Sequence, residues 1–236
     1  MAIMRAIDEQ YLKTPFYGRR RMAIVLKEHG FNVGEKKVGS LMKKMGIRAI
    51  YPRPRTTIPN KDHKVYPYLL KGLKVKAPNQ VWCSDITYIP MSGGFMYLCV
   101  IMDWYSRRVL SWSLSNTLDT EFCIYCLERA LYEQGRPEIF NSDQGSQYTS
   151  QKFVSVLKKH EIKISMDGKG RCIDNIFIER LWRSLKYELI YLREFENAKD
   201  LRKALKSWFE YYNTMRPHQG LDYKTPEEVY NFQEAA

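Results

Sequence analysis

Three acidic residues, Asp85, Asp143 and Glu179, lie in or next to apolar sequence patterns, where a carboxylate is unexpected. Asp85 lies inside the apolar stretch "QVWCSDITYIP", Asp143 follows the apolar "IF" of "PEIFNSD", and Glu179 lies on a helical pattern with 35 residues between it and Asp143. Hard oxygen ligands without His or Cys suit Mg²⁺ or Mn²⁺. Two such ions about 3.5–4 Å apart support phosphoryl transfer. If the three side chains converge, they predict a site for two metal ions.

Each strand acid also has an ordinary explanation. Asp85 could pair with a buried base, and Asp143 could form a turn. Asp is nevertheless depleted inside strands, and a buried charge is costly unless it is paired or binds metal. Asp143 ends its strand in the polar "SDQGSQ", and a loop after a strand is where open α/β sheets place their sites. Clustered carboxylates repel one another unless cations intervene.

The helical pattern around Glu179 has two stripes. The apolar stripe belongs in a core and consists of Ile178, Trp182, Leu185 and Leu189. The second stripe begins with Glu179 and continues with Arg183 and Lys186. Glu179 is therefore either the first half of a helix salt bridge or a metal ligand. In the second case, Arg183 and Lys186 are placed to hold a DNA phosphate.

The chain from residue 79 onward alternates strand-like and helix-like patterns. Three strands come first, in "QVWCSDITYIP" and "GFMYLCVIMDWYSRRVLSWSLS". Helix, strand, helix and strand follow in 119–134, "PEIFNSD", "TSQKFVSVLKKHE" and "IKISM". Two helices come last, over 171–188 and in "NAKDLRKALKSWFEYYN". This order predicts an α/β fold with a mixed sheet flanked by helices.

The N-terminal quarter is helical in pattern and strongly basic. The net charge of the chain is +12, and residues 1–60 hold 13 Lys and Arg against 4 Asp and Glu. "GRRRMAIVLKEHG" and "EKKVGSLMKKMG" read as two short helices joined by a tight turn, which is the helix-turn-helix pattern. We predict a DNA-binding subdomain over 1–50 and an extended basic linker over 51–78, although a merely solvated basic surface is the alternative. The candidate DNA contacts are Arg19, Arg20, Arg21, Lys36, Lys37, Lys43 and Lys44.

Composition limits the compartment and the partners. The longest apolar run, "FMYLCVIM", is far shorter than the roughly 20 residues of a membrane span. Five scattered cysteines include one CxxC pair, Cys123 and Cys126, which we interpret as core residues rather than a zinc or redox site. We therefore expect a reduced, intracellular protein with no membrane partner.

Several blocks together resemble a known family. "WCSDITYIP", "NSDQGSQYTS" and "DNIFIERLWRSLKYE" resemble the three blocks of the retroviral-integrase-like DDE core. The nearest resemblance is to the second-frame transposases of bacterial two-frame insertion sequences, which share the 35-residue spacing. "YYNTMRPHQGLDYKTPEEVY" is similar to their C-terminal block, and the N-terminal helices are similar to their helical subdomain.

The resemblance implies a fold, a chemistry and partners. The fold is an RNase H-like, mixed five-stranded sheet flanked by helices over 79–236. The implied catalytic triad is Asp85, Asp143 and Glu179, with Mg²⁺-dependent cleavage and strand transfer at the ends of an insertion sequence. The implied partners are double-stranded DNA, further copies of the chain on that DNA, and the upstream-frame product or a fusion with it. A bacterial cytoplasmic, nucleoid-associated location follows. Bases at similar offsets in retroviral integrases support Arg183 and Lys186 as DNA contacts.

Two functions compete with transposition. One is an RNase H-like nuclease that hydrolyses DNA without strand transfer, and the other is a non-catalytic DNA-binding regulator. The chain also departs from its relatives, because Asn141 stands where many carry His and no zinc-binding His/His/Cys/Cys set is present. Among other polar residues, Asp103 reads as a salt-bridged corner and His218 as structural. Asn175 reads as either a cap or a group that orients Glu179, and Gly168 and Gly170 read as hinge or turn residues.

Overall fold

In this computed structural model the chain divides into two compact units, Met1–Pro59 and Asn60–Ala236. The structure describes residues 1–50, 64–167 and 176–232. Gly168, Gly170 and Asn175 lie outside the described residues, as do residues 51–63 of the expected linker, so their predicted roles stay predictions. No helix in the described ranges is both long and apolar enough to cross a membrane.

The described part of the N-terminal unit, residues 1–50, contains three helices, α1 (Ala2–Lys13), α2 (Arg19–Glu28) and α3 (Glu35–Lys44). Its core consists of Ile7, Met22, Ala23, Leu26, Val33, Val38 and Met42. Met22 and Leu26 on α2, like Val38 and Met42 on α3, are four residues apart, so each pair lies on one side of its helix. Gly30 follows α2 in a left-handed conformation with φ of 85°, which favours glycine and ends the helix. The predicted pair of short helices is therefore present.

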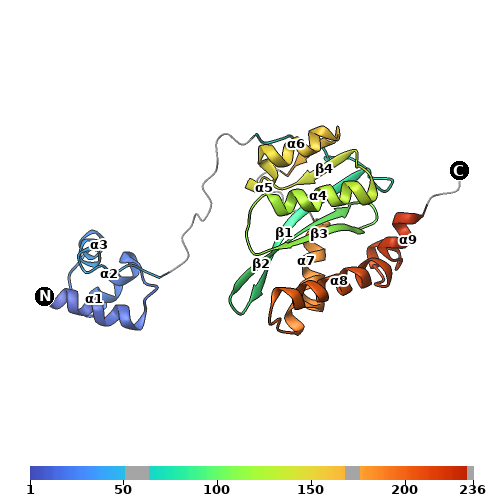
Figure 1. Cartoon of the computed structure of the whole chain (residues 1–236). Helices are drawn as coiled ribbons and strands as arrows, with labels where there is room; N and C mark the ends of the chain where they lie inside the picture. The colour runs from blue at the N-terminus through green and yellow to red at the C-terminus, as the bar shows by residue number, and fades with distance from the viewer. Residues whose placement is uncertain (51–63, 168–175, 233–236) are drawn as a thin grey trace. The chain divides into compact units, whose positions relative to one another are not determined.

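In the described part of the second unit, five strands form one mixed sheet (Figure 1). Their bounds are β1 (Val81–Met91), β2 (Gly94–Asp103), β3 (Val109–Ser115), β4 (Ile139–Ser142) and β5 (Lys163–Met166). The order across the sheet is β3-β2-β1-β4-β5. The β1–β2 and β2–β3 pairs are antiparallel, whereas β4 pairs parallel with both β1 and β5. The predicted mixed, five-stranded sheet is confirmed.

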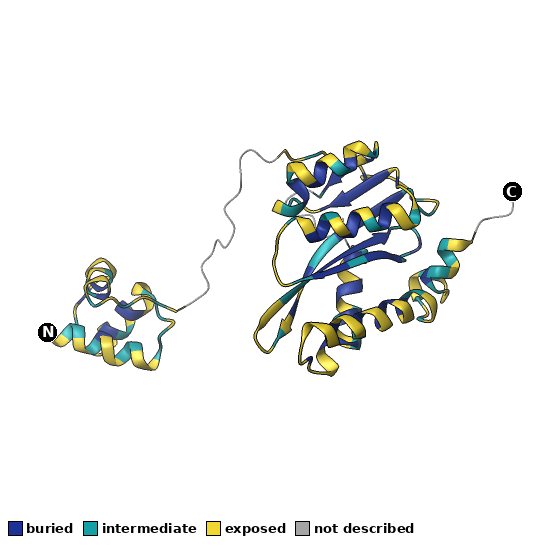
Figure 2. Ribbon diagram, in the orientation of Figure 1, coloured by how far each residue is buried: buried dark blue, intermediate teal, exposed yellow. Residues whose placement is uncertain are grey.

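Helices cover both faces of this sheet. The segment between β3 and β5 supplies α4 (Glu121–Gln134), the short α5 (Ser146–Thr149) and α6 (Gln151–Lys159). After β5 come α7 (Ile176–Glu188), η2 (Ile190–Leu192), α8 (Ala198–Thr214), η3 (Gln219–Leu221) and α9 (Pro226–Asn231). Side chains of α4 and α6 pack with Trp82 in one cluster, and those of α7 and α8 pack with Cys83 in another. The strands are mostly buried, while the helices are exposed on their outer sides (Figure 2).

Neighbouring residues of β1 therefore face different helices. Trp82 and Cys83 belong to opposite clusters because side chains alternate along a strand. Asp85 is two residues after Cys83, so it lies on the face covered by α7 and α8. The sequence of β1 thus places a carboxylate under α7.

One local prediction, the salt bridge of Asp103, needs correction. Asp103 is completely buried and forms no salt bridge with any described residue. Its carboxylate instead accepts hydrogen bonds from the backbone N–H of Asn79 at 2.8 Å and from the N–H and hydroxyl of Ser106 at 2.8 and 2.7 Å. Adjacent Arg108 pairs with Glu227 at 3.4 Å. The sequence shows bases beside Asp103, but the turn brings backbone and hydroxyl donors closer to it.

Cys123 and Cys126 are buried free thiols, as predicted.

Candidate active site

Asp85 is held by two hydrogen bonds on the α7 face of β1. Its Oδ2 accepts from the indole N–H of Trp182 at 2.8 Å, and its Oδ1 accepts from the backbone N–H of Ile86 at 2.8 Å. Neither donor is charged, so the buried base considered as a partner for Asp85 is not found among the described residues. The carboxylate is thus oriented without being neutralised.

Asp143 follows β4 at the start of a tight polar turn. Its Oδ1 accepts a hydrogen bond from the backbone N–H of Gly145 at 2.9 Å. A Cβ at position 145 would stand only 2.9 Å from that same oxygen, so the glycine leaves room for the carboxylate. Tyr148 connects this turn to β1, because its hydroxyl lies 2.9 Å from the Oγ of Ser84. Ser84 is the residue before Asp85 in β1. The "SDQGSQYT" stretch thereby ties Asp143 to the strand that carries Asp85.

The structure brings Asp85 and Asp143 to the same face of the sheet. In the parallel β1–β4 pair, Cys83 lies opposite Asn141, and the two acids are each two residues further on. Burial is the main cause that raises the pKa of Asp85 to about 6; the charge of Asp143 also raises this pKa, and the two hydrogen bonds lower it. Asp143 has access to solvent, yet the protein around its carboxylate displaces enough water to raise its pKa too. Two carboxylates that disfavour each other's charge suit a cation.

Glu179 is on the first turn of α7 and is exposed. It lies three residues before Trp182, so it is one turn away from the indole that contacts Asp85. It forms no salt bridge with any described residue, which removes the simple Glu179–Arg183 pair from consideration. Among residues 1–50, 64–167 and 176–232, however, no three His, Cys, Asp or Glu side chains lie close enough to hold a metal ion. The structure therefore places two of the three predicted ligands together, and Glu179 does not join them in a three-ligand cluster of described residues.

The structure also places two further polar residues, Asp167 and Asn141, next to the turn that carries Asp143. Asp167 follows β5, where its Oδ1 accepts from Asn141 Nδ2 at 2.9 Å and its carbonyl accepts from Gln144 at 2.8 Å. Asn141 is fully buried, and its Oδ1 has no hydrogen-bond partner among the described residues. A buried acceptor two residues before Asp143 fits a site that receives a cation or water.

Trp182 was predicted as a core residue, and it is buried. Its second role was missed, although a signal existed: a buried tryptophan usually finds a partner for its indole N–H. That partner is 97 residues away in the sequence, so only the fold reveals it.

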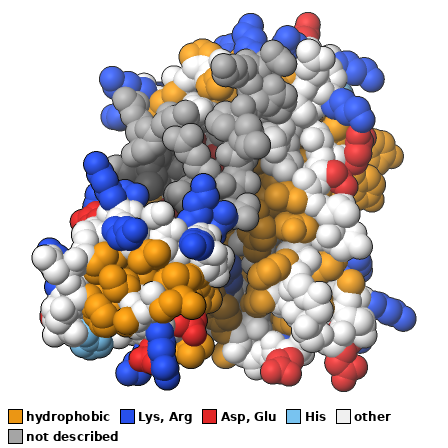
Figure 3. Space-filling model, turned by 90° about the vertical axis from the view of Figure 1, so that its left-hand side faces the viewer, with side chains coloured by type: hydrophobic (Ala, Val, Ile, Leu, Met, Phe, Trp, Pro, Cys, Tyr) orange, Lys and Arg blue, Asp and Glu red, His pale blue; other side chains and the backbone are white. Residues whose placement is uncertain are grey.

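The predicted DNA contacts are accessible. Arg183 is exposed and lies 6.0 Å above the ring of Tyr187, and Lys186 is partly exposed. In the N-terminal unit the exposed bases are Arg19, Arg20, Arg21, Lys36, Lys37, Lys43 and Lys44. Figure 3 shows Lys and Arg side chains projecting from the surface of the protein.

Comparisons with known proteins agree with this arrangement. Two models of an integrase core domain match residues 75–172 and 160–226, and a model of an HTH-like domain matches residues 1–55. The chain is 38% identical over 223 residues to the transposase for insertion sequence element IS904 of Lactococcus lactis, which covers 91% of this chain and 88% of the relative. The chain belongs to the transposase family of bacterial insertion sequences. The transposase InsF for insertion sequence IS3A of Escherichia coli is 32% identical over 221 residues, which cover 91% of this chain and 77% of that protein.

Solved structures show the same fold. A simian T-cell lymphotropic virus intasome contains a chain that matches with a TM-score of 0.62 at 18% identity, over 98% of this chain and 76% of that one. The catalytic core domain of HTLV-2 integrase in complex with magnesium matches with a TM-score of 0.55 at 24% identity, over 66% of this chain and 98% of that one. The predicted RNase H-like, integrase-type fold is confirmed.

The family also decides between the predicted functions. A DNA transposase, and with it the enzyme class of polynucleotidyl transferases, is confirmed over a nuclease or a non-catalytic regulator. The family match does not test which side chains of this transposase carry the reaction. The catalytic, metal-binding and DNA-contacting residues therefore stay predictions.

Proposed function

We propose that this transposase cleaves DNA at the ends of its insertion sequence and joins the 3′-hydroxyl ends to a target, using Asp85, Asp143 and Glu179. The observation that carries the proposal is the shared face of Asp85 and Asp143, where each carboxylate is desolvated and Asp143 raises the pKa of Asp85. Trp182 fixes Asp85 one helical turn from Glu179. Glu179 is exposed and without a salt bridge to described residues, so its side chain is available to complete the set.

The all-oxygen donor set fits Mg²⁺ or Mn²⁺, and three carboxylates suffice for two ions. Such ions lower the pKa of an attacking hydroxyl and neutralise the charge on the leaving oxygen. The chain's own groups keep the ligands in place, because Trp182 and the Gly145 N–H each restrain one carboxylate oxygen. Arg183 and Lys186 extend from Glu179 along α7, where they would hold the phosphates of the bound strand.

We also propose that the N-terminal unit binds double-stranded DNA. Its bases are exposed and its helices match an HTH-like domain. We further propose that copies of the chain assemble on DNA, that the upstream-frame product or a fusion with it takes part, and that the transposase is associated with the nucleoid.

Strand transfer itself tests the proposal. The assay supplies a pre-cleaved insertion-sequence end with a 3′-hydroxyl, a supercoiled target plasmid and Mg²⁺, with the fused two-frame product used if the single frame is silent. The expected product is end DNA covalently joined to the plasmid, and none should form when the end carries a 3′-dideoxy nucleotide or when Asp143 is changed to Asn. Plasmid nicking without joining would support hydrolysis alone and contradict the proposal.

We expect the arginines of α2 to account for part of the salt dependence of duplex binding. The variant changes three exposed residues to Gln: Arg19, Arg20 and Arg21. The slope of the logarithm of the binding constant against the logarithm of the salt concentration should become less negative by about 0.9 for each lost phosphate contact. The measurement is fluorescence anisotropy with duplex DNA over a range of salt. A matched triple change on α8 removes the same charge elsewhere, at Lys199, Lys203 and Lys206. Equal slopes for the two triple variants would show that α2 makes no specific contribution.

A further inference from the structure

A hollow of about 800 Å³ lies between α7 and the segment that follows α8. We call it the arginine hollow, because its walls include Arg180 and Arg183 of α7, Arg216 after α8, and Arg107 of the turn between β2 and β3. Ser184 also lines it and follows Trp182 by two residues, a rotation of about 200° around the helix. The arginine hollow is therefore on the opposite flank of α7 from the indole that contacts Asp85.

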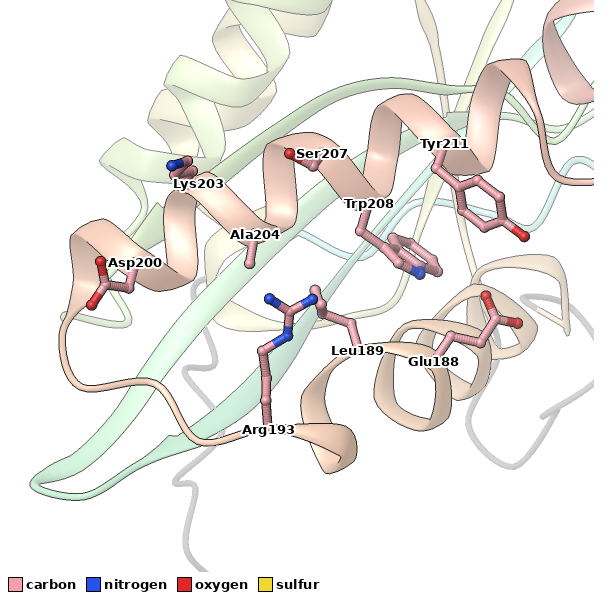
Figure 4. Close-up of a pocket in the computed structure, with 9 residues that line it drawn as sticks. All are labelled: Glu188, Leu189, Arg193, Asp200, Lys203, Ala204, Ser207, Trp208 and Tyr211. Carbon is pink, nitrogen blue, oxygen red and sulfur yellow. The ribbon is translucent and has the colours of Figure 1, made fainter.

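The arginine hollow carries a net positive charge. Its acid, Glu188, is paired with Arg216 at 2.7 Å. The other three arginines form no salt bridge with described residues, so three positive charges remain unbalanced. The neighbouring hollow of about 460 Å³ differs, because it has a second acid, Asp200, in its lining beside Arg193 and Lys203 (Figure 4).

Arg107 is a partly buried cation that forms no salt bridge with a described residue. Its Nε is buried with no hydrogen-bond partner among the described residues, and its guanidinium lies 3.1 Å from the ring centroid of Phe177. Its backbone has a φ of 65°, and its N–H donates to the carbonyl of Asp103 at 2.9 Å. Burial lowers its pKa to about 10, which still leaves it charged at neutral pH. Burying a charge is costly unless it is paired, so an anion next to the Arg107 guanidinium would be favourable.

Aromatic and polar groups stand beside these charges. Tyr187 and Tyr223 line the arginine hollow and are 65% and 70% exposed. Tyr223 has a φ of 62°, an unfavourable conformation for a bulky side chain, and its N–H donates to the carbonyl of His218 at 2.9 Å. His218 Nε2 is buried without a partner among the described residues. Exposed aromatic rings next to positively charged side chains are the features that bind unstacked nucleotides.

We propose that the arginine hollow binds one unpaired nucleotide of a DNA strand, with its phosphate on Arg107 and Arg183 and its base against Tyr223. A phosphate supplies an anion for Arg107, which has no salt bridge to a described residue. The phosphates of a DNA duplex lie on its outer surface and are contacted by exposed side chains. Arg107 is partly buried, so we expect it to be reached by a nucleotide that has left the duplex. The volume is within the range of about 300–1,000 Å³ that small ligands occupy in proteins. The proposal rests on the proposed function only in naming DNA as the strand.

The test compares a blunt duplex with the same duplex carrying three unpaired nucleotides at one end. Affinities of the full chain are measured by fluorescence anisotropy in EDTA, so that no chemistry takes place. Wild type should bind the overhang DNA about tenfold more tightly, the scale of one base stacked on an aromatic side chain. Arg107→Gln and Tyr223→Ala should each lose most of this preference while blunt-duplex affinity changes less than twofold. Tyr223→Phe should retain it.

Controls separate this site from its surroundings and from catalysis. Lys203→Gln removes one charge from the neighbouring hollow and should keep the overhang preference, as should Asp143→Asn, so failure of strand transfer leaves this test unaffected. Because Arg107→Gln could impair folding, its thermal unfolding is measured, and the exposed Tyr223 variants carry the test if it is unstable. The proposal is overturned if wild type shows no preference, if Tyr223→Ala weakens both DNAs equally, or if a free mononucleotide competes as strongly as the overhang strand.

Discussion

Glu179→Gln should abolish most strand transfer while leaving the fold and DNA binding intact. Glutamine keeps the size and hydrogen-bonding capacity of the side chain but removes the charge that a metal ion needs. We expect the rate to fall by roughly 100- to 1,000-fold or more, the scale on which loss of one charge-stabilising group slows an enzyme. The measurement is joining of pre-cleaved end DNA to plasmid in Mg²⁺. Duplex affinity and thermal unfolding should match those of wild type.

The alternative for Glu179 predicts a much smaller effect. An exposed helix pair contributes about 0.3–0.5 kcal/mol, and the structure shows no such pair between described residues. Glu210→Gln is a matched control, because Glu210 is also an exposed helical acid without a salt bridge to described residues. Near wild-type joining by Glu179→Gln would exclude it as a ligand and would leave Asp85 and Asp143 without the third carboxylate that the proposed site requires.

The sequence predicted the strand acids because their patterns are local. Asp85 interrupts an apolar strand, and Asp143 marks the change from apolar to polar residues at a strand end. Their shared face depends on pairing between β1 and β4, which are far apart in the sequence. The resemblance to known transposases supplied that pairing in advance, whereas residue spacing alone could not.

Contacts between distant segments escaped prediction. The periodicity of α7 places Trp182 in the core but does not show which buried group accepts its N–H. Arg107 reads as one of two bases in a turn, and only the packing of Phe177 and of the segment after α8 reveals it as a recessed cation. For Asp103 the sequence predicted a contact that is not formed. The neighbouring arginines suggested an ion pair, whereas the folded turn places the uncharged N–H and hydroxyl donors of Ser106 next to the carboxylate.

Asp85→Asn should make the metal-free protein more stable at neutral and higher pH. The pKa of Asp85 is about 6 in the folded state and 3.8 when unperturbed. Keeping the side chain ionised in the fold therefore costs about 3 kcal/mol, at 1.36 kcal/mol for each unit of difference. Asparagine removes the charge and keeps an oxygen for Trp182. By the size scaling of thermal unfolding, the melting temperature at pH 8 should rise by roughly 6–12 °C.

The pH dependence gives this prediction its sign. Because the folded-state pKa is raised, the folded protein binds more protons than the unfolded chain between about pH 4 and 6, and stability rises as pH falls through this window. The advantage of Asp85→Asn should be complete above pH 7 and vanish below about pH 4. Asp119→Asn is the opposite control, because a hydrogen bond from Thr117 lowers the pKa of Asp119 and its loss should not stabilise the protein. Mg²⁺ should raise the melting temperature of wild type and have less effect on Asp85→Asn. A mutant less stable than wild type at pH 8 would show that Trp182 needs the charged carboxylate and that Asp85 is not desolvated for metal binding.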